Sequence, residues 1–196
     1  MLQFLRTRSI YHLKESDPQA FVLPRLEGAA KVALAELLYD EFGGGRPSQL
    51  HAALYGDALQ AAGLDREYGT YLDEVSALTL AVSNAMSLFC LHRRLRGAAM
   101  GHLAMFEITS SVPCRRIAAG IERVGLPPAA SAYFHEHVEA DAVHEQVAAR
   151  DICGSLVAAE PGQRTEVLLG AATCLVLDDL AAREQLGTWL GTETAA

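Results

Sequence analysis

Apolar residues recur at helical spacing from one end of the chain to the other. No alternating apolar and polar run, bounded by turn residues, persists anywhere, so the pattern predicts an all-α fold. A first helix is expected to end near Ser16, and a second, capped by Asp17-Pro18 and kinked at Pro24, to end at Gly43-Gly44-Gly45. A third is expected to start at Pro47. Further helices are predicted roughly over 75–94, 97–111, 113–124, 128–149 and 162–189.

The stretch HVEADAVH, residues 137–144, departs from simple amphipathicity. His137, Asp141 and His144 fall within about 60° of one another on a helix, because each residue turns the chain by about 100°. Ala130, Phe134 and Ala148 continue this stripe, whereas polar residues gather on the opposite side of the helix. Three ionisable groups therefore occupy positions that the pattern assigns to the core, where they need partners.

Composition narrows the class of protein. The 196 residues are 51% hydrophobic and 20% charged, which suits one globular domain over 1–196. A net charge of −8 without a broad basic region argues against a nucleic-acid partner. The four cysteines are far apart and form no C-x-x-C pair, and neither a secretory signal nor a membrane span is apparent, so a soluble cytoplasmic protein is expected. The last helix is apolar around much of its circumference, which predicts a central position or a homodimer interface.

Other predicted helices place further ionisable residues where the stripe could find partners. Glu107 shares an inward row with Met100, Leu103 and Cys114. Glu41 and His51 flank the glycine turn, which permits a tight reversal that brings both to one point, and Glu15 ends the first helix. We prefer Glu41 to Glu36 because it adjoins this turn. The four carboxylates balance the charge of two divalent ions, and the mixture of carboxylate oxygen and imidazole nitrogen without thiolate favours iron or manganese over structural zinc.

The order of these residues resembles that of the haem-oxygenase-like diiron oxidases, also called iron-containing redox enzymes. Their pattern has a Glu on the first core helix, a Glu and a His about ten residues apart, a later Glu, and His-x-x-x-Asp-x-x-His. The stretches YHLKESDP, DEFGGGRPSQLH, LHRRLRGAAMGHLAMFEITSS and HVEADAVHEQ carry the resemblance over nearly the whole chain. The matching positions, which the resemblance implies to be metal ligands, are Glu15, Glu41, His51, Glu107, His137, Asp141 and His144.

The resemblance implies a haem-oxygenase-like bundle of about seven helices without haem. It also implies two Fe(II) ions, with O2 as cosubstrate, and the oxidation of a small molecule by N-oxygenation of an amine or cleavage of a C–C or C–N bond. From the sequence, Glu107 is our preferred bridge between the two ions, and the three histidines are expected to be terminal ligands.

Three alternatives remain open from the residues. His137, Asp141 and His144 could form a two-His, one-carboxylate set for a single iron, the other acids lying outside it. The bundle could instead bind haem or another tetrapyrrole, with His12 as the axial ligand. A metal-free interaction bundle, whose polar core only specifies packing, is the third.

Overall fold

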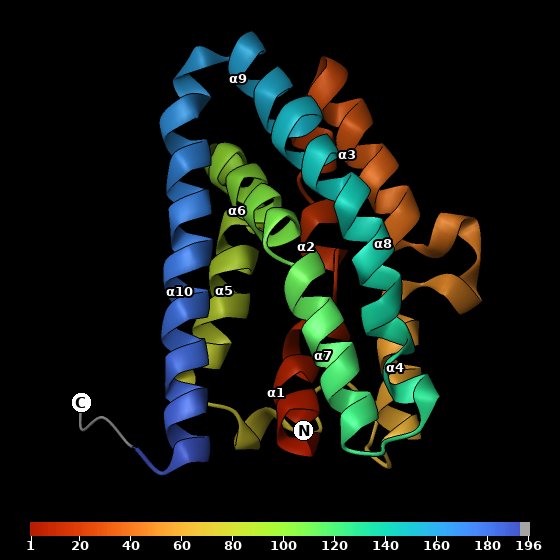
Figure 1. Ribbon diagram of the computed structural model, residues 1–196. Helices are drawn as coiled ribbons and strands as arrows, with labels where there is room; N and C mark the ends of the chain where they lie inside the picture. The colour runs from red at the N-terminus through yellow and green to blue at the C-terminus, as the bar shows by residue number, and fades with distance from the viewer. Residues whose placement is uncertain (193–196) are drawn as a thin grey trace.

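The computed structural model describes residues 1–192, and this part of the chain contains helices, turns and loops but no strand. The predicted all-α fold is confirmed. Eight helices have eleven residues or more (Figure 1): α1 Leu2–His12, α3 Gly28–Glu41, α4 His51–Ala61, α5 Ala77–Leu91, α6 Arg96–Ile108, α7 Ser111–Arg123, α8 Ala132–Gln146 and α10 Arg164–Leu190. Two short helices, α2 Asp17–Ala20 and α9 Ser155–Ala159, complete the set. Residues 193–196 of the predicted single domain lie outside the described part, and that prediction is untested.

Several predicted boundaries were wrong. The third helix begins at His51 rather than Pro47, because Pro47–Gln49 forms a separate turn. The first helix ends at His12 rather than near Ser16, because residues 13–16 form a turn that closes with Ser16 in the left-handed region at φ 65°. The second segment breaks after Ala20 and resumes only at Gly28. The helix predicted to end at residue 149 continues as a π-helical segment over Val147–Gly154 (η7) and then as α9.

The helices arrange around α8 and α6. On one side of the bundle α10 lies along α6 and α5 (Figure 1). On the other side α3 packs against η7, the continuation of α8, and α7 and α4 pack against α8 itself. The closest approach joins α6 to α10. A Cβ built on Gly101 would lie 1.9 Å from the carbonyl oxygen of Val167, and one built on Gly170 would lie 1.9 Å from that of Ala98. Only hydrogen at these two positions lets the backbones touch.

The described core falls into two apolar clusters that α8 connects. Phe134 and Tyr133, at the start of the helix, belong to the cluster formed with α1, α4 and α7. Ala148, just past its end, belongs to the cluster formed with α3, α5 and α6. The predicted stripe thus runs from one apolar cluster to the other, and its polar residues lie where the two meet, shielded from water on both sides.

Helix α10 is not central. It covers α6 with one face and exposes several large apolar side chains on the other, which are Leu168, Leu175, Val176, Leu180 and Leu186. Such a surface is typical of an interaction face. A second subunit on this face stays a prediction.

Candidate metal centre

The seven ionisable residues singled out in the sequence come from different elements of the fold, some of them from helix ends. Glu41 is the last residue of α3, His51 the first of α4, and Glu107 the last but one of α6. Glu15 lies in the turn after α1, and α8 contributes the remaining three from its centre and second half. All seven are buried, with 1–6% of their surface exposed. Their inward placement is confirmed, whereas their role as ligands stays a prediction.

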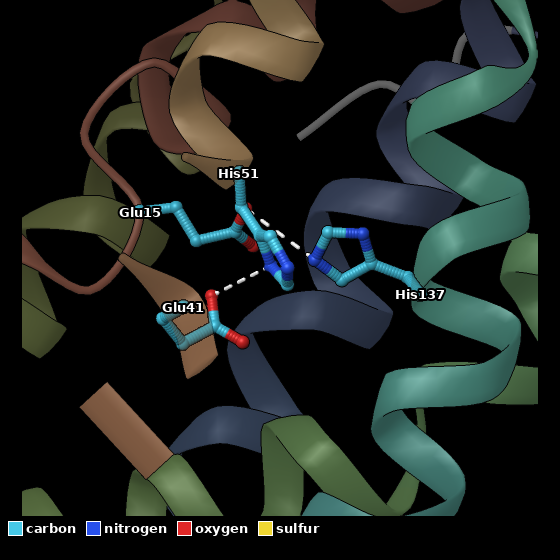
Figure 2. Close-up of side chains that lie close together, drawn as sticks. All are labelled: Glu15, Glu41, His51 and His137. Carbon is cyan, nitrogen blue, oxygen red and sulfur yellow. Dashed lines mark ion pairs between the residues drawn. The ribbon is translucent and has the colours of Figure 1, made fainter. Parts of the chain in front are cut away.

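The glycine turn joins Glu41 to His51 as the sequence indicated. Gly43 has φ 75°, and a Cβ on it would lie 2.6 Å from the carbonyl carbon of Gln49, so the chain can fold back on itself only with glycine there. The reversal places Glu41 Oε2 at 3.0 Å from His51 Nδ1 (Figure 2). Glu36, the alternative on the same helix, is exposed, so Glu41 is the inward carboxylate.

The potential ligand atoms form two groups. Within each group, all the atoms lie within 4.8 Å of one another. The first contains Glu15, Glu41, His51 and His137, and Figure 2 shows these four side chains pointing toward one another from different elements. The second contains Glu41, Glu107 and His144. Six of the seven residues are therefore brought together, and Glu41 is common to both groups. Glu107, the bridge preferred from the sequence, belongs to one group only.

Asp141 is the exception. It is 1% exposed, but it belongs to neither group, and its Oδ2 has no hydrogen-bond partner among the described residues. Burial and the neighbouring charge of Glu107 raise the pKa of Asp141 to about 8. An unpartnered buried carboxylate of this kind carries an energetic cost unless a cation or a proton compensates it.

The donor atoms converge without forming ordinary hydrogen bonds. His137 Nε2 lies 3.5 Å from Glu15 Oε2, and His144 Nδ1 lies 3.3 Å from Glu41 Oε1 and 3.7 Å from Glu107 Oε2. These two nitrogens and His51 Nδ1 have no hydrogen-bond partner among the described residues, although carboxylate oxygens are this close. Nitrogen and oxygen atoms that lie this close together without a hydrogen bond between them fit a shared metal ion better than a hydrogen-bonded network.

The charges of the centre require positive compensation. Burial alone would raise the pKa of Glu41, but ion pairing with His144 and His51 lowers it to about 2. Burial opposes protonation of the histidines, yet Glu15 raises the pKa of His137 to about 10, and Glu107 and Glu41 raise that of His144 to about 11. In the metal-free protein protons on these imidazoles balance the carboxylates. A divalent cation would replace those protons, so binding would release them.

Backbone and hydroxyl groups orient two of the candidate ligands. His137 Nδ1 donates to the carbonyl oxygen of Tyr133 at 2.8 Å, which assigns the proton to that nitrogen and leaves Nε2 free for a metal. Ser16 donates its hydroxyl to Glu41 Oε2 at 3.2 Å from its left-handed backbone position. The sequence interpretation missed Ser16, since nothing in the pattern marks residue 16 as the end of a tight turn.

Tyr133 was also missed. The Tyr133 hydroxyl donates to Glu15 Oε2 at 2.6 Å and lies 2.6 Å from His12 Nδ1. It therefore orients the carboxylate of Glu15, which lies in a turn outside any helix. Because the hydroxyl proton of Tyr133 goes to Glu15, the contact with His12 is a hydrogen bond when Nδ1 of His12 donates to the Tyr133 oxygen. Burial lowers the pKa of His12. The signal was available, because Tyr133 precedes His137 by one helical turn on the same stripe.

Replacing Tyr133 by Phe is expected to weaken metal binding at the Glu15 group by about 10–100-fold, because Glu15 loses the bond that orients it. Metal competition titration of the purified protein measures this. Tyr55→Phe is the matched control: Tyr55 is equally buried and donates a 2.7 Å bond to the carbonyl of Leu5, away from the carboxylates. Equal losses of metal affinity in both variants would contradict the orienting role.

Residues 2–179 match the sequence profile of a family described as iron-containing redox enzymes. The chain belongs to this family. No curated protein matches it. The membership confirms the resemblance drawn from the motifs and, with the all-helical architecture, the haem-oxygenase-like bundle, which here has eight long helices in the described part rather than about seven. Membership also indicates that the protein is an oxidoreductase and that its metal is iron.

The residues present fit iron. Each group combines carboxylate oxygens with imidazole nitrogens, a donor set that suits iron, and no cysteine belongs to either. The carboxyl ends of α3 and α6, at Glu41 and Glu107, lie at the centre, and their partial negative charge favours a cation there, whereas the single amino end, that of α4 at His51, opposes it. No helix within residues 1–192 is both long and apolar enough to cross a membrane.

Proposed function

We propose that this member of the iron-containing redox enzymes is a nonhaem diiron oxidase that uses O2 to oxidise a small organic molecule. The observation that carries the proposal is that two ligand groups share one carboxylate, Glu41. A shared carboxylate is how carboxylate-rich helical bundles hold two metal ions close together. Iron at these positions would supply reductive activation of O2.

The buried residues of the chain would hold the two ions in two neighbouring positions. Glu15, His51 and His137 would hold one ion, Glu107 and His144 the other, and Glu41 would bridge them. Asp141, buried beside Glu107 with a free oxygen, would complete the second position after a small side-chain movement. Tyr133 and Ser16 would keep Glu15 and Glu41 oriented during turnover. The two apolar clusters on either side would keep water out of the reaction.

A cavity of about 190 Å³ between α1, α5 and α10 is the place we propose for the organic substrate. Tyr11 lines it and packs against Phe106 with ring centroids 4.7 Å apart. Burial and the charges of Glu15, Glu107 and Glu41 raise the pKa of Tyr11, so the three carboxylates lie near this wall of the cavity. A substrate there would approach the metal centre from the side of α1.

The alternatives are less well supported. A single iron on His137, Asp141 and His144 leaves Glu15, Glu41 and His51 clustered and buried without a cation. Haem bound through His12 meets a filled space, because the rings of Tyr55, Tyr133 and Phe134 pack around that imidazole with centroids 4.7–6.4 Å away. A metal-free bundle leaves four unpartnered buried donor atoms unexplained.

The test is anaerobic loading with Fe(II) followed by mixing with O2. We expect two ions per chain, with O2 consumption and a transient visible absorbance, and neither O2 consumption nor absorbance in the Zn(II)-loaded protein. One ion per chain would favour the mononuclear alternative. Absence of bound iron beyond traces would contradict the proposal. An intense haem absorbance band in protein from haem-supplemented cells would contradict it in favour of the haem-binding alternative.

A further inference from the structure

A second cavity, of about 330 Å³, lies on the opposite flank of the metal centre, between the end of α3, the 43–49 turn and α8. In Figure 1 this turn projects outward beside α8. Two of its lining side chains, His51 and His144, are candidate ligands that are only 4% and 2% exposed. The rim consists of exposed residues, among them Asp40, Arg46, Glu136 and Glu139. The cavity therefore joins solvent to the ligands themselves.

The two histidines at the base of this cavity carry unpartnered nitrogens on the side of the metal centre. Nδ1 of His51 and Nδ1 of His144 have no hydrogen-bond partner among the described residues. The other nitrogen of His144, Nε2, lies 3.5 Å from Oδ2 of Asp40, a carboxylate whose side chain is half exposed. Asp40 on the rim and His144 at the base are thus neighbours, and a cation that reached Asp40 would be next to the centre.

Charge separates this cavity from the one beside Tyr11. Its rim carries three carboxylates, Asp40, Glu136 and Glu139, against the single guanidinium of Arg46. The cavity beside Tyr11 carries one of each sign, Arg8 and Asp178, among mostly apolar and uncharged residues. A cleft lined by one sign of charge concentrates ions of the opposite sign and raises their association rate. The cavity with the acidic rim suits a hydrated cation, whereas the cavity beside Tyr11 suits an organic molecule.

We propose that the cavity lined by Asp40, Glu136 and Glu139 is the route by which divalent iron reaches the centre, with Asp40 as the last carboxylate before His144. This inference rests on the proposed function, because it requires a metal to bind at the two groups. The route predicts that rim charge controls how fast metal binds, while the number of ions bound at equilibrium stays at two.

The experiment follows binding of Co(II) to the metal-free protein by stopped-flow absorbance. Asp40→Asn, Glu136→Gln and Glu139→Gln should each slow association by a few-fold, and the triple variant by about tenfold, because an oriented field raises on-rates by about 10-fold or more. Arg46→Gln should accelerate it. The rate of the wild type should fall with added salt more steeply than that of the triple variant. Glu36→Gln, an exposed charge on the same helix as Asp40, is the matched control and should bind at the wild-type rate.

The outcomes separate the route from the function. A triple variant that binds Co(II) as fast as the wild type, or a control slowed equally, would overturn the route alone. Lower equilibrium affinity in Asp40→Asn, with Glu136→Gln and Glu139→Gln unchanged in rate, would make Asp40 a positioning residue for His144 and overturn the route as well. A wild type that binds no Co(II) would overturn the proposed function and the route with it.

Discussion

Glu41→Gln is expected to abolish both metal positions, although it changes one residue. Glu41 is the only carboxylate common to the two ligand groups in the described part of the chain, so its loss leaves neither group complete. The variant should bind fewer than one ion per chain where the wild type binds two. Activity should fall by more than about 100-fold, since the loss of outer partners of metal ligands alone costs about 10–100-fold.

Stability provides an independent measurement of the same variant. Ligand at 100 times its Kd stabilises a folded protein by about 2.7 kcal/mol per site, so wild-type unfolding should shift upward with added metal and that of Glu41→Gln should not. Glu107→Gln should keep one ion, because the group of Glu15, Glu41, His51 and His137 stays intact. Glu36→Gln controls for loss of a charge from α3. Two ions retained in Glu41→Gln would contradict the bridge.

The inward face of α8 could be predicted because helical periodicity fixes which residues share a side. His137, Asp141 and His144 continue a row of small and aromatic residues, and their burial follows from that row. Glu41 and His51 could be paired because the glycines between them permit only a short reversal. In both cases the information is local, within about ten residues of chain.

The carboxylate common to both ligand groups could not be predicted, since it depends on how far each helix reaches along the bundle. Helical periodicity gives the direction in which a side chain points, but not its position along the axis of the bundle. Glu107 and Glu41 both point inward, and only the packing of α3 against η7 and of α6 against α8 decides that Glu41 reaches both groups. The same limit applies to Asp141, which shares the stripe of the two histidines but joins neither group.

The turn at Glu15 was misread for a different reason. Residues 13–16 suit a helix, and a serine in the left-handed region is uncommon, so the chain was expected to stay helical to Ser16. The conformation is compatible with tertiary bonds that the sequence alone does not reveal, from Ser16 to Glu41 and from Tyr133 to Glu15. A strained residue next to a buried carboxylate cluster is typical of functional sites.

Gly101→Ala and Gly170→Ala are each expected to lower the free energy of unfolding of the metal-free protein by about 3 kcal/mol. The added methyl would meet a backbone carbonyl at 1.9 Å, and backbone cannot move aside as a side chain can, so α6 and α10 must separate. Overpacking of a core costs about 1–3 kcal/mol or more, which exceeds the helix propensity of about 1 kcal/mol that alanine gains over glycine. Chemical denaturation measures the loss.

Gly154→Ala is the matched control within the helical segment η7. A Cβ there meets only the carbonyl of Ala149, at 3.7 Å, so propensity should dominate and stabilise the protein by about 0.5–1 kcal/mol. Because α6 carries Glu107, separation of α6 from α10 should also displace that carboxylate and weaken the second metal position while the first is kept. Variants at Gly101 and Gly170 that matched the stability of Gly154→Ala would show that the two helices do not touch through these glycines, and metal occupancy would then be independent of their packing.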